Sequence, residues 1–263
     1  MKTIKIKCPA KINLNLKITG KRDDGFHNIE SIMQTINLFD YLTISAENNF
    51  KNEIILTGNS NQIPYDEHNL VYKAVKLFLE TTEIKNQKIS INIEKNIPVA
   101  AGLAGGSTDA AGTIFGLNEI FNNPLSENQM HELCSKLGSD LNVCLKGGKI
   151  LAKGRGEIIE PMPFEEFNLS LIKPLNLGIS AKEAYTKYSV KKETQTNDSF
   201  ENDLEWAVIE DYKELQHIKE KYPKSVMTGS GSTYFIIDDK FENEKDYWTS
   251  NNLKSINYGV CIA

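Results

Sequence analysis

The sequence has 263 residues, of which 40% are hydrophobic and 25% are charged, the composition of an ordinary globular protein. Its formal net charge of −5 argues against a nucleic-acid partner or an anionic membrane surface. The chain has no apolar run of membrane-spanning length, and its start, MKTIKIKCPAKINLNL, lacks the apolar core of a signal peptide. Its four cysteines show no C-x-x-C spacing, so we expect reduced thiols in a cytoplasmic protein.

Alternating apolar and polar residues in the first sixty positions predict β-strands. Turn residues separate them, namely Gly20 and the Asp23-Asp24-Gly25 segment. The predicted strands cover residues 4–7, 12–18, 29–36 and 42–46. An amphipathic helix is then predicted over residues 69–81, where apolar residues recur at helical spacing, and KISINIE at 88–94 alternates as a strand does.

The rest of the chain mixes helices and strands. Ser126 is the predicted N-cap, and Gly138 the predicted end, of a helix over residues 127–137. The polar segment 191–201 is predicted to be a mobile connection. Further strands are predicted at 143–146, 149–153, 169–173, 225–228, 234–238 and 255–262, and further helices at 181–188, 204–210, 212–221 and after Phe241.

The order of these elements is typical of an α+β protein with two subdomains. A new unit begins near the Pro161-Met162-Pro163 segment. We place the division at residue 155, which gives subdomains of residues 1–155 and 156–263.

Residues 97–112, IPVAAGLAGGSTDAAG, are unusually rich in glycine and alanine. We expect Gly102 to Gly106 to form a loop before a helix that begins near Ser107. The free N–H groups and the dipole of such a helix attract anions, and glycine lets phosphate approach the main chain. Ser107 and Thr108 add hydroxyl donors, and Asp109 could reach a metal ion or cap the turn. The alternative is a tight helix–strand junction in which the glycines only permit close packing, and neither standard nucleotide fingerprint, G-x-x-x-x-G-K-[ST] or G-x-G-x-x-G, occurs here.

Three segments read together resemble the motifs of the GHMP small-molecule kinases. The first is CPAKINLNLKITGKRDDGFH, the second is the glycine-rich stretch, and the third is MTGSGSTYF at 227–235. The D-G-F-H of the first resembles the form that acts on a cytidine diphosphate-linked methylerythritol in non-mevalonate isoprenoid synthesis. The resemblance implies the two-subdomain fold of that family, with the active site in the cleft between the subdomains.

The resemblance also implies roles for two charged residues that would otherwise be taken for ordinary ones. Lys11, by itself, would be interpreted as a solvated lysine, and Asp140 as a turn-forming aspartate. The family pattern makes Asp140 the general base and places Lys11 beside the substrate hydroxyl, where its charge would stabilise the transferring phosphoryl group. These two are the expected catalytic residues.

The remaining expected site residues follow from the same resemblance. Those assigned to ATP and its phosphates are Gly102, Leu103, Ala104, Gly105, Gly106, Ser107, Thr108, Asn69 and Lys95. Those assigned to the substrate are Asn13, Phe26, His27 and Tyr185, although an aromatic–histidine pair such as Phe26-His27 is usually packing. Two residues depart from the pattern: Ala104 replaces a common glycine, which is tolerable only if φ is not positive there, and Asn142 stands where the family usually has proline.

We therefore expect an ATP- and Mg²⁺-dependent kinase that phosphorylates the 2-hydroxyl of the cytidine diphosphate-linked methylerythritol, with its metal ligands left unassigned. One alternative is a GHMP kinase for another small alcohol, such as mevalonate or homoserine. Another is a catalytically silent nucleotide-binding protein on the same fold. The D-G-F-H segment argues against the first, and the presence of both Lys11 and Asp140 argues against the second.

Overall fold

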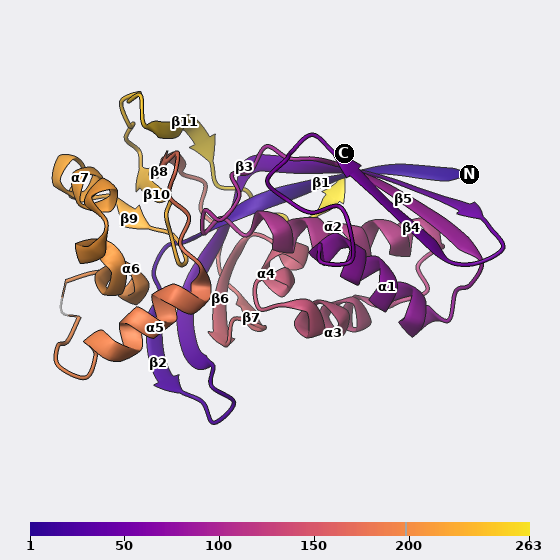
Figure 1. The fold of residues 1–263 in the computed structure, drawn as a ribbon, viewed down its shortest axis with the longest axis horizontal. Helices are drawn as coiled ribbons and strands as arrows, with labels where there is room; N and C mark the ends of the chain where they lie inside the picture. The colour runs from indigo at the N-terminus through magenta and orange to yellow at the C-terminus, as the bar shows by residue number, and fades with distance from the viewer. Residues whose placement is uncertain (198) are drawn as a thin grey trace.

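The computed structural model describes residues 1–197 and 199–263. It consists of two sheets, whose strands are mostly antiparallel, and of helices that lie beside them (Figure 1). The larger sheet has the strand order β12-β1-β3-β5-β4, with β2 and β6 also pairing with β3, and β7 with β6. Its strands are β1 (Lys2–Asn13), β2 (Lys17–Lys21), β3 (His27–Asn48), β4 (Glu53–Gly58), β5 (Gln87–Glu94), β6 (Lys149–Gly154), β7 (Ile158–Pro161) and β12 (Cys261–Ile262). The mixture of helices and sheets confirms the predicted α+β class.

The smaller sheet has the order β11-β8-β10-β9 and comes from the later part of the chain. Its strands are β8 (Asn168–Pro174), β9 (Val226–Met227), β10 (Tyr234–Ile237) and β11 (Tyr247–Lys254). The helices are α1 (Leu70–Thr82), α2 (Gly105–Ile120), α3 (Glu127–Leu137), α4 (Leu141–Lys146), α5 (Ala181–Lys191), α6 (Asp203–Val208), the short 3₁₀ helix η1 (Ile209–Asp211) and α7 (Lys213–Lys221). In Figure 1, α1 to α4 lie beside the larger sheet and α5 to α7 beside the smaller one.

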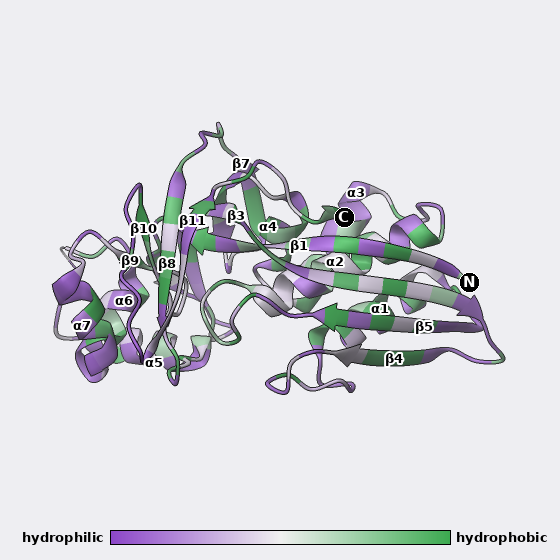
Figure 2. Cartoon of the chain, turned by 90° about the horizontal axis from the view of Figure 1, so that it is seen from above, coloured by the Kyte–Doolittle hydropathy of each residue, from purple (hydrophilic) through white to green (hydrophobic). Residues whose placement is uncertain are grey.

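One face of the larger sheet is buried beneath α1 and α2. Apolar and polar residues alternate along β1, β3 and β5 (Figure 2), and this period places one set of side chains in the core. Helix α2 approaches the sheet closely because it has glycine at the contact: a Cβ on Gly112 would lie 2.4 Å from Cys8 Sγ, and one on Gly116 would lie 2.6 Å from Ile44 Cδ1. The close-packing interpretation therefore holds for these two later glycines.

Two helix starts carry a side-chain cap, and one of these caps, Ser126, was predicted. The Asn69 side chain accepts a hydrogen bond from the Val71 N–H at the start of α1. Ser126 forms a capping box with Gln129 at the start of α3, and that helix ends before Gly138, as predicted. Both caps satisfy N–H groups that the first turn of a helix leaves unpaired.

Several predicted elements were wrong. The segments 29–36 and 42–46 are parts of one long strand, β3, and the predicted strand at 143–146 is helix α4. No helix follows Phe241 among the described residues, where β11 begins six residues later; the predicted final strand at 255–262 shrinks to β12. The predicted connection at 191–201 includes Asp198, which lies outside the described residues.

The division into subdomains at residue 155 stays a prediction. Strand β7 pairs with β6 in the larger sheet, and β12, at the end of the chain, pairs with β1. A buried cluster also joins the two parts, because Ile29 and Met33 of β3 pack in the same core as Leu204 and Trp206 of α6. None of the helices in the part of the chain that the structure describes is long and apolar enough to span a membrane.

Candidate active site

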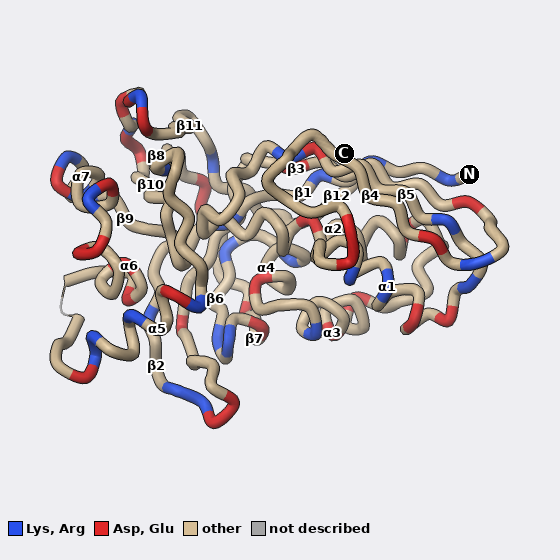
Figure 3. The backbone as a smooth tube through the Cα atoms, viewed as in Figure 1, with Lys and Arg blue, Asp and Glu red and all other residues tan. Residues whose placement is uncertain are grey.

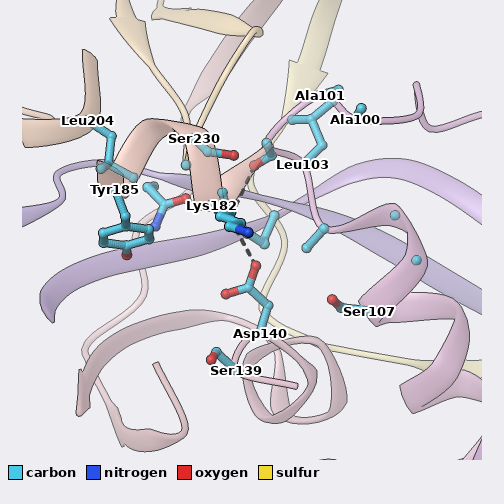
Figure 4. Close-up of a pocket in the computed structure, with 18 of the residues that line it drawn as sticks. Ala100, Ala101, Leu103, Ser107, Ser139, Asp140, Lys182, Tyr185, Leu204 and Ser230 are labelled. Carbon is cyan, nitrogen blue, oxygen red and sulfur yellow. Dashed lines mark hydrogen bonds and ion pairs between the residues drawn. The ribbon is translucent and has the colours of Figure 1, made fainter. Parts of the chain in front are cut away.

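A cavity of about 1080 Å³ lies where the two glycine-rich segments, the first strand and helix α5 meet (Figure 4). It gathers residues from β1, the β2–β3 hairpin, the segment before α2, the start of α4 and one face of α5. The predicted site residues that line it are Lys11, Asn13, Phe26, His27, Asn69, Lys95, Gly102, Leu103, Ala104, Gly105, Gly106, Ser107, Asp140 and Tyr185. Thr108 is the exception: it is fully buried and is not part of the cavity wall.

Lys11 and Asp140 form an ion pair inside this cavity. The Lys11 ammonium lies 3.5 Å from Asp140 Oδ2 and donates hydrogen bonds to Asn13 Oδ1 at 2.7 Å and to the Gly102 carbonyl at 3.1 Å. Three acceptors thus hold one buried ammonium in place. Asp140 stands directly before the short helix α4 but makes no side-chain capping hydrogen bond, and its side chain remains 31% exposed. Its carboxylate is therefore open to a ligand in the cavity, as the close-up shows (Figure 4).

The third motif segment, MTGSGSTYF at 227–235, connects the other two motif segments through Thr228. Its hydroxyl accepts a hydrogen bond from the Asn13 backbone N–H at 2.9 Å and lies 3.2 Å from the Gly102 carbonyl, to which it donates. Asn13 also donates from Nδ2 to Ser31 Oγ at 2.8 Å. Since the Lys11 ammonium contacts both Asn13 and Gly102, this network fixes its position from two sides.

The helix behind the glycine-rich segment begins earlier than predicted. Gly105 and Gly106 are the first residues of α2, so the loop is Gly102 to Ala104 and not Gly102 to Gly106. A Cβ on Gly106 would have no described neighbour within 4 Å, whereas one on Gly102, at φ +74°, would lie 2.1 Å from the Thr228 carbonyl oxygen. Gly106 therefore leaves open space at the cavity, and Gly102 permits a close backbone approach. The free N–H groups of the first turn of α2 border that space.

Ala104 has a left-handed backbone, with φ +59° and ψ +28°. The sequence-based condition that this residue avoid positive φ is thus not met, and the alanine methyl group is accommodated at a cost. A non-glycine residue in this region loses about 1 kcal/mol relative to glycine.

We expect Ala104→Gly to raise the free energy of unfolding by up to about 1 kcal/mol, because it relieves that strain. Ala111→Gly is the matched control: Ala111 lies in the interior of α2, where the same change costs about 1 kcal/mol. Chemical denaturation measures the change in the free energy of unfolding, which should be positive for Ala104→Gly and negative for Ala111→Gly. A destabilised Ala104→Gly variant would contradict the strained geometry.

Lys95 is held by two buried carboxylates below the start of α2. Its ammonium pairs with Asp40 and lies 2.8 Å from Asp109 Oδ2. Burial would lower the pKa of Lys95, but the charges of Asp109 and Asp40 outweigh it and raise the pKa. Burial raises the pKa of Asp109 to about 7, against the lowering effect of Lys95. The ammonium also lies 3.0 Å from where a Gly105 Cβ would be, so Lys95 supports the first residue of α2 from below.

An aromatic group occupies the other end of the cavity. The His27 and Tyr185 rings stack at 5.1 Å with an interplanar angle of 15°, and His27 Nε2 lies 3.1 Å from Ser189 Oγ. Partial burial, with Lys21 and Lys192 nearby, lowers the pKa of His27, which favours the neutral imidazole. The Phe26 ring is 54% exposed and lies 5.2 Å from the Arg155 guanidinium. Three rings, those of Phe26, His27 and Tyr185, therefore border a surface on which a planar ring could stack.

Sequence reasoning missed three cations that line the cavity, namely Lys21, Arg155 and Lys182. Lys21 lies within the first motif segment but at a position that the motif leaves unspecified, and Arg155 lies in no motif, so only the fold shows that they line the site. The sequence did contain a signal that could have identified Lys182 as a site residue. Lys182 precedes the predicted site residue Tyr185 by three residues on a segment predicted to be helical. That spacing places both on one helix face.

Comparison with known proteins gives a consistent set of relatives. Residues 69–148 match the GHMP kinases N terminal domain. The chain is 39% identical to the 4-diphosphocytidyl-2-C-methyl-D-erythritol kinase of Clostridium perfringens, covering 90% of this chain and 89% of the relative. A solved 4-(cytidine 5'-diphospho)-2C-methyl-D-erythritol kinase superposes with a TM-score of 0.71 at 24% identity, covering 88% and 89% of the two chains. A homoserine kinase from Cytophaga hutchinsonii also gives 0.71, at 14% identity and covering 100% and 98%.

Proposed function

The chain belongs to the GHMP kinases, in the group of the 4-diphosphocytidyl-2-C-methyl-D-erythritol kinases, and from this membership we propose that it transfers the γ-phosphoryl group of ATP to the 2-hydroxyl of 4-diphosphocytidyl-2-C-methyl-D-erythritol. The observation that carries the proposal is the Lys11–Asp140 ion pair, which faces the same cavity as the N-terminus of α2. A general base and a phosphate-binding helix end thus share one space.

The pair divides the work of the transfer between its two members. Asp140 accepts the proton of the attacking hydroxyl as the new bond from oxygen to the γ-phosphorus forms and the bond to the β–γ bridging oxygen breaks. Lys11, fixed by Asn13 and Gly102, stabilises the negative charge on the attacking oxygen and on the transferring group. Positioning and charge stabilisation supply most of the catalysis in such reactions.

On the nucleotide side, the first-turn N–H groups of α2 would bind the phosphates of ATP. The residues present also fit a magnesium ion that arrives with the triphosphate. Asp109 Oδ1 is buried without a hydrogen-bond partner among the described residues, and Asp109 and Ser107 both line the cavity. Magnesium commonly takes one or two carboxylates together with phosphate oxygens, so these two side chains would hold it, and the ion would neutralise phosphate charge.

On the acceptor side, the aromatic residues Phe26, His27 and Tyr185 favour a substrate with a planar base. The homoserine kinase neighbour shows that the fold alone does not separate these substrates. We expect these aromatic residues to separate them, because homoserine and mevalonate carry no ring that could stack on an aromatic side chain. A coupled ADP-release assay with the cytidyl substrate, mevalonate and homoserine tests this: turnover should be confined to the cytidyl substrate, and preferred turnover of either small alcohol would refute the assignment.

We expect Phe26→Ala to raise the KM for the cytidyl substrate about ten- to a hundredfold, because base–aromatic stacking is worth roughly 1–3 kcal/mol. The KM for ATP should change little. Phe50→Ala is the matched control, since Phe50 is fully exposed and lies outside the cavity. Steady-state kinetics measures both variants, and an unchanged substrate KM in Phe26→Ala would remove Phe26 from the site.

A further inference from the structure

The cavity wall carries an excess of positive charge, although the whole chain is acidic. Acidic and basic residues are intermixed along the chain (Figure 3). Five cationic side chains line the described part of the cavity, against two carboxylates, Asp109 and Asp140. Each of these carboxylates is already paired with a lysine. Of the other three cations, Arg155 pairs with Glu157 at 3.6 Å, so Lys21 and Lys182 remain for a ligand.

Lys182 differs from Lys21, which ends strand β2, because it lies on helix α5. The residues Lys182, Tyr185, Thr186 and Ser189 all line the cavity, and their spacing of three, four and seven places them on one face of the helix. Lys182 lies in the first turn, and Tyr185 and Ser189 follow toward the aromatic end, where Ser189 contacts His27. Lys182 therefore precedes the base-binding residues by about one turn, or roughly 5 Å.

The charge of Lys182 is free to meet a ligand. Its side chain is exposed, and within the described residues its ammonium has no hydrogen bond or ion pair. Other lysines of the same helix are engaged: Lys187 lies 2.6 Å from Asp211, and Lys191 lies 3.1 Å from Glu210. The N-terminal end of α5 adds the positive pole of the helix dipole on the same side.

We propose that Lys182 binds the diphosphate of the nucleotide-linked substrate and selects acceptors that carry this group. This inference rests on the proposed function, whose substrate is linear in the order alcohol, diphosphate, nucleoside. With the alcohol at Asp140 and the base at Tyr185, the diphosphate would lie between them in the cavity, which Lys182 in the first turn of α5 also lines. A lysine ammonium is a suitable partner for phosphate oxygens.

Calorimetric titration with cytidine diphosphate, cytidine monophosphate and cytidine tests the proposal. The variants are Lys182→Met, which keeps the length of the side chain, and Lys182→Arg, which keeps its charge. Lys187→Met is the control, since it removes one charge from the same helix outside the cavity. In the parent protein the diphosphate should bind more tightly than the monophosphate.

We expect Lys182→Met to weaken cytidine diphosphate binding about ten- to a hundredfold, the usual loss for one charged hydrogen bond, and to leave cytidine binding unchanged. Lys182→Arg should recover most of the affinity, and Lys187→Met should match the parent protein. In turnover, Lys182→Met should raise the KM for the cytidyl substrate with little change in kcat or in the KM for ATP. An equal loss for all three probes, or none, would overturn the role of Lys182.

The outcome also separates this inference from the function on which it rests. If the parent protein prefers the diphosphate and Lys182→Met keeps that preference, the diphosphate is bound elsewhere and the proposed kinase activity still stands. If the parent protein binds none of the three cytidine probes, both the inference and the cytidyl substrate are refuted.

Discussion

Asp140→Asn is expected to lower kcat by at least about a hundredfold while leaving substrate binding nearly unchanged. An alcohol holds its proton tightly at neutral pH, so the attacking oxygen needs an acceptor as its bond to phosphorus forms. General-base assistance is typically worth about 10²- to 10⁴-fold. Asparagine keeps the shape of the side chain at the start of α4 and removes its basicity and charge. Steady-state kinetics with both substrates measures the effect.

Lys11→Ala should cause a comparable fall in kcat, because its ammonium lies 3.5 Å from the Asp140 carboxylate. The double variant should be only slightly worse than either single one, since both residues act on one transfer. Asp239→Asn, an exposed aspartate outside the cavity, is the control and should behave like the parent protein. Substantial turnover by Asp140→Asn would place the general base on another residue.

Gly106→Val should have the second large effect, a rise of at least about tenfold in the KM for ATP with the fold intact. A Cβ at this position meets no described atom within 4 Å, so the helix accommodates the side chain. That open space is where the N–H groups of the first turn of α2 would bind phosphate. Valine fills it, and the phosphates can no longer approach the main chain.

Gly102→Val separates phosphate binding from folding. At Gly102 a Cβ would lie 2.1 Å from the Thr228 carbonyl oxygen, on a backbone with φ +74°, so this variant should lose stability. Thermal denaturation should therefore show a loss of stability for Gly102→Val and none for Gly106→Val. Nucleotide titration should show that Gly106→Val weakens ATP binding although the protein is folded. If Gly106→Val bound ATP normally in a folded protein, the phosphates of ATP would not approach the main chain at Gly106.

The elements that the sequence predicted well are those whose signals are local. Asn69 and Ser126 cap their helices through contacts within three residues, and KISINIE alternates along the whole of β5. The predicted strand at 143–146 was wrong because a short apolar run does not distinguish a buried strand from a buried helix. Strand β3 was divided in two between residues 36 and 42, the part of the strand where its pairing with β1 shifts register from Phe39 to Ile36.

The site residues also divide into those that a local sequence motif predicted and those that only long-range contacts reveal. The motifs predicted Lys11, Asp140 and the glycine-rich segment, and all of them line one cavity. The pairing of Lys95 with Asp40 and Asp109 could not be predicted, because it joins three separate elements through long-range contacts. The positive φ of Ala104 was equally hidden, since glycine is the residue that usually marks such a backbone.

The most direct test of the central claim is the ³¹P NMR spectrum of the product made from ATP and 4-diphosphocytidyl-2-C-methyl-D-erythritol. Carbon 2 of the acceptor bears a methyl group and no hydrogen, so a phosphate on its hydroxyl has no proton on the adjoining carbon to couple with. We predict one new phosphomonoester singlet, formed in step with ADP and formed at least about a hundredfold more slowly with Asp140→Asn. A proton-coupled phosphomonoester signal, or ADP release without any new phosphomonoester, would contradict the proposed transfer.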